Sequence, residues 1–112
     1  MTDCLFCKIE KGEIPSNKVY EDEDVIVFKD LYPKADVHLL IVPRKHIDSL
    51  NELLPEDQPL MGKMMLLLPK LAKEQGLGQG FRTIINTGKG GGQEVFHLHI
   101  HILGGANALP FA

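Results

Sequence analysis

Three histidines alternate with three aliphatic residues in the segment HLHIHIL, which spans residues 97–103. A β-strand repeats every two residues, so we expect His97, His99 and His101 on one face and the aliphatic residues on the other. Consecutive histidines would stand roughly 6.6 Å apart, which lets one imidazole act on a ligand while its neighbours support it. The alternatives are a half-exposed strand that happens to carry histidines and an adventitious metal-binding face. Three of the five histidines in strict register favour a functional row.

The composition indicates one globular domain. The chain has 112 residues, of which 44% are hydrophobic, and we expect a single domain over residues 1–112. The formal net charge is −3 with scattered basic residues, whereas nucleic-acid binding requires a basic stripe or a high pI. No apolar stretch is long enough for a membrane span, and the N-terminus lacks a signal-peptide pattern. These features predict a cytoplasmic protein that binds neither nucleic acid nor membrane.

Periodicity and turn residues predict the order of the secondary-structure elements. A short helix is expected over residues 5–11 and a long helix over 55–75, in which Pro69 should introduce a kink. Strands are expected over residues 19–21, 25–28, 37–42, 81–86 and 95–103. Strand pairs joined by short loops around one long helix predict an α+β fold with a five-stranded, mainly antiparallel sheet.

Cys4 and Cys7 form a C-x-x-C pair near the N-terminus. In a cytosolic chain this spacing indicates a metal site or a redox pair more than a structural disulfide. A thioredoxin-like pair follows a strand, and no strand is expected before Cys4, so metal binding is favoured. Together with His46 and His97 the cysteines form a Cys₂His₂ set, the usual composition of a closed structural zinc site. The alternative is two free cysteines, a surface His46, and a His97 that only braces its neighbour.

The glycine-rich segment GKGGG at residues 88–92 does not indicate a P-loop. It lacks the G-x-x-x-x-G-K-[ST] order, and a strand rather than a helix is expected after it.

The chain resembles the histidine triad (HIT) superfamily, and within it the Hint branch of small nucleoside phosphoramidate hydrolases. The resemblance rests first on residues 97–103, with GGQ before them at 91–93 and Gly104-Gly105 after them. It runs nearly end to end. The other matching segments are CLFCKI at 4–9, GEIP at 12–15, FKD at 28–30, His38, PRKH at 43–46, and Asn86.

The resemblance implies catalytic roles for three histidines. His99 would attack the α-phosphorus of a nucleotide and carry a covalent nucleotidyl intermediate. His101 would bind phosphate oxygens and assist the leaving group, and His38 would support the proton network from a neighbouring strand. A neutral imidazole is a good nucleophile near pH 7 when one ring nitrogen keeps its lone pair. Asn86 and the backbone amides from Gly92 to Val95 would hold the phosphate.

The resemblance also implies a nucleoside site. Asp30 would accept hydrogen bonds from both ribose hydroxyls, which suits a carboxylate. Four apolar residues match the base-binding slot of the family, although each by itself is more typical of a core. They are Phe6, Ile14, Phe28 and Leu31.

Two segments depart from the family pattern. Some members carry a small hydroxyl residue where this chain has Glu94, and an inward carboxylate would repel phosphate. We therefore assign only the backbone amide of residue 94 to binding. The tail, residues 106–112, is short, and in this branch the tail shapes substrate preference, so the leaving group stays open.

The resemblance implies a hydrolase of purine nucleoside 5′-phosphoramidates and acyl- or aminoacyl-adenylates. Its products would be nucleoside monophosphates such as AMP or GMP, formed by double displacement. It further implies a homodimer with one extended sheet, and a structural zinc ion on Cys4, Cys7, His46 and His97. The alternatives are a dinucleoside polyphosphate hydrolase of the same superfamily and a nucleotide-binding regulatory protein. A redox or metal-storage protein would leave Asp30 and Asn86 unexplained.

Overall fold

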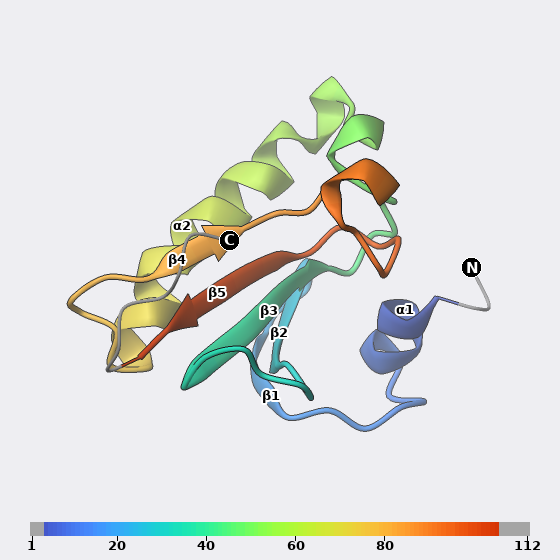
Figure 1. Ribbon diagram of the computed structural model, residues 1–112. Coiled ribbons are helices and arrows are strands. Elements are labelled where there is room, and N and C mark those ends of the chain that lie inside the picture. Colours follow the sequence, from blue (N-terminus) through green and yellow to red (C-terminus); the bar gives the residue numbers. More distant parts are fainter. Residues whose placement is uncertain (1–3, 106–112) are drawn as a thin grey trace.

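The computed structural model describes residues 4–105, which contain a five-stranded antiparallel sheet with a helix on each face (Figure 1). The strand order is β1-β2-β3-β5-β4, and each neighbouring pair runs antiparallel. The strands are β1 (Lys18–Glu21), β2 (Val25–Lys29), β3 (Val37–Pro43), β4 (Arg82–Ile84) and β5 (Ile100–Gly104). The helices are α1 (Leu5–Glu10) and α2 (Gln58–Glu74), with 3₁₀ turns at Leu50–Glu52, Pro55–Asp57 and Lys89–Gly91. The predicted α+β fold is confirmed.

Helix α2 covers one face of the sheet and forms the larger core. Its buried residues, Met64, Leu67, Leu68, Leu71 and Ala72, recur at helical spacing and therefore form one stripe. That stripe packs on the alternate residues of β2, β3 and β5 that point toward it, including Ile100 and Ile102. Each such side chain contributes about 1.5–3 kcal/mol when fully buried, so packing against α2 holds β5 in place on the face opposite its histidine.

Helix α1 covers part of the opposite face. Phe6 and Ile9 pack there on Phe28, Leu40 and Val42 from the centre of the sheet. This is also the face on which the histidines of β3 and β5 lie, because they alternate with the residues that contact α2.

The prediction that the fifth strand begins at Val95 is wrong, because β5 begins at Ile100. Its partner β3 ends at Pro43, which has no N–H to continue the ladder. The backbone N–H of Leu98 instead donates to the carbonyl of Ile47 at 2.6 Å, outside the sheet. His97 and His99 therefore precede the strand, although the predicted alternation of faces holds from His99 onward.

The largest other differences from the predicted boundaries are in the fourth strand and the long helix. Strand β4 spans only 82–84, and the long helix begins at Gln58 because residues 55–57 form a 3₁₀ turn. The helix continues through Pro69 to Glu74. Within residues 4–105, no helix is long and apolar enough to cross a bilayer.

Candidate active site and metal-binding cluster

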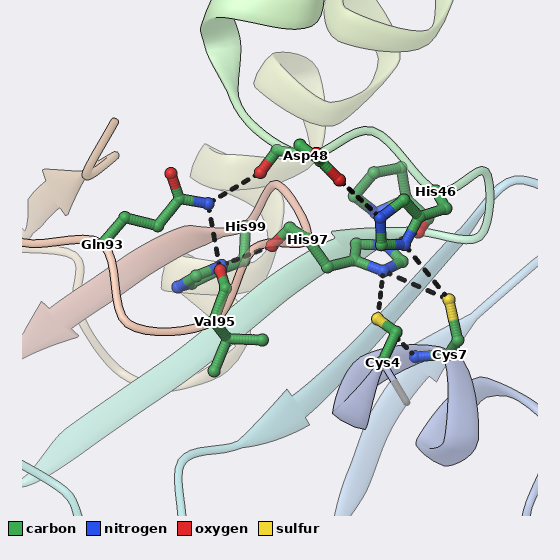
Figure 2. Close-up of polar contacts among 9 residues, drawn as sticks. Cys4, Cys7, His46, Asp48, Gln93, Val95, His97 and His99 are labelled. Atoms are coloured by element: carbon green, nitrogen blue, oxygen red, sulfur yellow. Dashed lines mark hydrogen bonds and ion pairs between the residues drawn. The ribbon is translucent and has the colours of Figure 1, made fainter. Parts of the chain in front are cut away.

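The three histidines of the motif divide between two clusters, and Figure 2 shows His97 and His99. The His97 ring faces Cys4 and Cys7, whereas the His99 ring points away from these cysteines. His101 pairs with Leu40 across the β3–β5 ladder. His38, two residues before Leu40, is thus a diagonal neighbour of His101 on the same face. The His101 ring centroid lies 5.1 Å from that of His38 and 5.0 Å from that of His99.

A chain of hydrogen bonds sets the tautomers of His38 and His101. The backbone N–H of Lys34 donates to Nδ1 of His38 at 3.1 Å, so a neutral His38 carries its proton on Nε2. That Nε2–H donates to Nδ1 of His101 at 2.8 Å, which leaves the His101 proton on Nε2. Burial lowers the pKa of both rings, and that of His101 falls to about 4. Both rings are therefore neutral at pH 7, and His101 presents a donor.

His99 has the opposite arrangement. Its Nδ1–H donates to the backbone carbonyl of His97 at 2.7 Å, so the lone pair lies on Nε2. The edge of Phe6 packs against the ring, with centroids 5.0 Å apart, and only 7% of the residue is exposed. Burial lowers the pKa of His99, so the ring stays neutral at pH 7. His99 is thus a neutral imidazole in a fixed orientation with one free nitrogen.

Two clefts meet at these histidines. An apolar cleft of about 330 Å³ contains His99 together with Gly92 and Val95. The four predicted base-slot residues, Phe6, Ile14, Phe28 and Leu31, line this apolar cleft. It is extended by residues that the sequence analysis did not select, namely Leu5, Ile9, Pro15 and Leu40.

A second cleft of about 400 Å³ lies beside the first and contains His38. It is bordered by Lys34, Arg82, Ile84 and Leu103. Five residues line both clefts: Asp30, Tyr32, Asn86, Glu94 and His101. The structure therefore brings the predicted catalytic and substrate-binding residues to one place, with His101 between the clefts.

Asp30 is held at this junction by the loop that follows β2. Its Oδ1 accepts the backbone N–H of Tyr32 at 2.8 Å, and its Oδ2 lies 3.5 Å from Nε2 of His38. An ionised carboxylate offers about four acceptor positions, so Asp30 keeps capacity for further donors.

Gln93 organises the loop over the apolar cleft, a role that the sequence analysis missed. Its Nε2 donates to the carbonyls of Asp48 at 2.7 Å and Val95 at 3.0 Å, and its Oε1 accepts the N–H of Gly88 at 2.8 Å. Only 5% of the residue is exposed. The same loop needs a positive φ of 84° at Gly92, which glycine adopts without strain.

The four predicted metal ligands converge in a second cluster (Figure 2). Cys4 Sγ lies 3.2 Å from Nδ1 of His97, and Cys7 Sγ lies 3.3 Å from Nδ1 of His46. On the outer side, Nε2 of His97 donates to the carbonyl of Pro43 at 2.8 Å. Nε2 of His46 lies 2.7 Å from an Asp48 oxygen. Both imidazoles therefore direct Nδ1 lone pairs at the sulfurs.

This donor set fits a tetrahedral ion. Bonds of about 2.3 Å to sulfur and 2.0–2.1 Å to nitrogen separate the S and N ligands by roughly 3.6 Å. The observed S···N separations are 3.2, 3.3 and 3.5 Å, and all four ligand atoms lie within 4.8 Å of one another. Burial and the adjacent Cys4 raise the pKa of the Cys7 thiol to about 11, so a cation is required to keep it ionised near pH 7. The cluster could hold a metal ion.

Comparisons with known proteins agree with this geometry. A family model described as "Scavenger mRNA decapping enzyme C-term binding" matches residues 3–112. Protein HitA of Neisseria gonorrhoeae is 61% identical over 104 residues, which cover 93% of this chain and 97% of the relative. A histidine triad protein from Clostridium difficile superposes with a TM-score of 0.93 at 49% identity, covering 100% of this chain and 98% of the other. The chain belongs to the histidine triad family.

A structure of a HIT family hydrolase from Legionella pneumophila is also similar, with a TM-score of 0.91 and 45% identity. It covers 94% of this chain and 95% of that one. The HIT superfamily comprises nucleotide-binding hydrolases, and the resemblance inferred from HLHIHIL is confirmed at that level.

In this HIT protein, several supporting groups have no sequence signal of their own. The Lys34 amide and the Gln93 side chain act through contacts across the fold. Asp48 follows His46 by two residues, and a carboxylate so close to a candidate ligand was a usable signal. The tail at 106–112, expected to influence the leaving group, lies outside the described residues.

Proposed function

We propose that this HIT protein hydrolyses purine nucleoside 5′-phosphoramidates and acyl- or aminoacyl-adenylates at the α-phosphorus. The observation that carries the proposal is the pair of opposite tautomers. His99 offers a lone pair on Nε2, whereas His101 beside it offers a proton on Nε2. Displacement at phosphorus requires a nucleophile next to a hydrogen-bond donor that supports the leaving group.

In the first step, Nε2 of His99 forms a bond to the α-phosphorus, and the bond from phosphorus to the leaving nitrogen breaks. The leaving nitrogen takes the electron pair of that bond and a proton from solvent, while the Nε2–H of His101, which stays neutral, donates a hydrogen bond to it. The carbonyl of His97, 2.7 Å from Nδ1 of His99, stabilises the positive charge on the nucleotidyl-imidazole.

In the second step, water attacks phosphorus and the bond to His99 breaks. The attacking water releases one proton to solvent, which balances the proton that the leaving nitrogen took up in the first step. The amine and the nucleoside monophosphate leave, and the enzyme recovers its starting protonation state.

The proposed substrate contacts follow the clefts. The purine would lie in the apolar cleft near Phe6 and Phe28, and Asp30 would accept the ribose hydroxyls. Asn86 and the backbone amides from Gly92 to Val95 would donate to the phosphate oxygens.

We also propose that the ion held by Cys4, Cys7, His46 and His97 is zinc. Four protein ligands would leave zinc no open position, so it would supply a structural cross-link and no chemistry. The cross-link would join the start of α1 to the segment after β3 and to His97, whose carbonyl orients His99.

We further propose a homodimer. Leu66 and Met65 on the outer side of α2 are 78% and 45% exposed, and β4 is a short strand at the edge of the sheet. Exposed apolar groups and an open edge commonly lie in subunit interfaces. A sedimentation mass of one chain at micromolar concentration would contradict the dimer.

The experiment that tests the function is rapid quenching of the protein with adenosine 5′-phosphoramidate, followed by peptide mass spectrometry. We expect an adenylyl group on His99. His99→Ala should retain nucleotide affinity and lose turnover by about 10⁴-fold or more. Adduct on another residue, or His99→Ala activity within tenfold of wild type, would contradict the mechanism. Preferred turnover of a diadenosine polyphosphate would favour the alternative hydrolase, and binding without turnover would favour a regulatory protein.

A further inference from the structure

We infer that Glu94 selects the leaving group, favouring a cationic or neutral amine over an anionic polyphosphate. This inference rests on the proposed function, because it names the substrate class of that same site. It starts from the position of Glu94 on the wall shared by the two clefts.

The distribution of the histidines shows where the leaving group would lie. His99 lines only the apolar cleft, His38 lines only the second cleft, and His101 lines both. In a displacement at phosphorus, the attacking and leaving atoms are roughly in line on opposite sides. A nucleotide in the apolar cleft, attacked by His99, would therefore direct its leaving group past His101 into the second cleft.

The charges at the junction are negative. Of the five residues that line both clefts, only Asp30 and Glu94 carry a formal charge at pH 7, since His101 is neutral there. Asp30 is hydrogen-bonded to the Tyr32 amide. Glu94 is exposed, and among residues 4–105 no lysine or arginine forms an ion pair with it. Its charge is therefore free to act on the group that enters the second cleft.

The nearby cations do not occupy the junction. Lys34 and Arg82 line only the second cleft, and Lys29 lines only the apolar cleft. The Lys34 ammonium also donates to the carbonyl of Tyr32 at 3.3 Å. A polyphosphate would place its first anionic charge beside Asp30 and Glu94, where it is repelled. An amine leaving group, or an aminoacyl group with its ammonium near the phosphorus, would be attracted there.

The test compares three adenylates in steady-state assays. The first is an AMP phosphoramidate of a short diamine, with a free terminal ammonium. The second is its N-acetylated, neutral analogue, and the third is diadenosine tetraphosphate. Each is measured with wild type, Glu94→Gln and Glu94→Ser.

Glu23→Gln is the matched control. Glu23 lies in the turn before β2, at the opposite end of that strand from Asp30, and its side chain is 82% exposed. The Glu23→Gln substitution removes the same charge as Glu94→Gln, at a position remote from the clefts.

For Glu94→Gln and Glu94→Ser we expect kcat/KM for the cationic substrate to fall about three- to tenfold and that for the tetraphosphate to rise by a similar factor. The kcat/KM for the neutral substrate should change by less than about twofold. The differences between wild type and the Glu94 variants should shrink at high salt, because mobile ions screen the charge. Glu23→Gln should change none of the ratios.

Equal changes for all three substrates, or no change in the ratio of cationic to anionic substrate, would overturn the role of Glu94 and leave the proposed function standing. A wild type that hydrolyses none of the three would overturn the proposed function and this inference together. Thermal unfolding of both Glu94 variants shows whether they are folded before the ratios are compared.

Discussion

Replacing Gln93 by leucine removes three hydrogen bonds that hold the loop over the apolar cleft. The side chain joins Gly88, Asp48 and Val95 at 2.7–3.0 Å and is nearly completely buried. Each lost bond costs about 1 kcal/mol, and the added apolar burial of leucine returns part of it, which leaves a net loss of about 2–3 kcal/mol. For a domain of this size, that lowers the melting temperature by about 10 °C or more.

Thermal unfolding and amide hydrogen exchange of residues 88–96 measure this loss. Gln93→Glu should be more harmful than Gln93→Leu, because it places a carboxylate oxygen against the carbonyls of Asp48 and Val95. Gln79→Leu, at an exposed position, is the control. A Gln93→Leu protein that melts within about 3 °C of wild type, with unchanged exchange in the loop, would refute the reasoning.

Three further predictions concern the metal cluster, the ribose site and the buried histidines. Purified protein should contain about one zinc ion per chain, and Cys7→Ser should lower the melting temperature by more than about 5 °C; metal-free protein produced with ample zinc would contradict this. Asp30→Asn should weaken ribonucleotide binding by roughly 1.5–3 kcal/mol and affect 2′-deoxynucleotides less; equal losses in calorimetry would remove Asp30 from the ribose site. The pKa of His101 falls from 6.5 to about 4 on folding. Between pH 4 and pH 6.5 the unfolded chain therefore binds more protons than the folded chain. The free energy of unfolding should be highest above pH 6.5 and decrease by up to about 3 kcal/mol toward pH 4. Denaturant unfolding should show a shallower decrease for His101→Asn, and identical pH profiles would contradict the assignment.

The alternation in HLHIHIL was sufficient to predict which side chains face the α2 core and which face the clefts. A two-residue period is a local property of extended backbone, so it holds at His99, Ile100, His101 and Ile102 whatever surrounds them. The spacing of apolar residues in the long helix was informative for the same reason, and its buried stripe lies where the period requires.

The residue at which β5 begins was not predictable from local sequence. Whether residues 95–99 join the ladder depends on the hydrogen-bonding groups that β3 offers, and β3 ends at a proline there. The carbonyl of Ile47, far away in sequence, takes the Leu98 amide instead.

Only the tertiary structure decided how the histidines are divided and tuned. Cys7 and His46 are 39 residues apart, and Cys4 and His97 are 93 residues apart, so their convergence depends on how α1 docks on the sheet. The tautomers of His38 and His101 depend on the amide of Lys34, which any residue except proline would supply. The sequence determined which imidazoles are available, and the fold determined which nitrogen of each carries the proton, because that choice depends on partners brought together from distant segments.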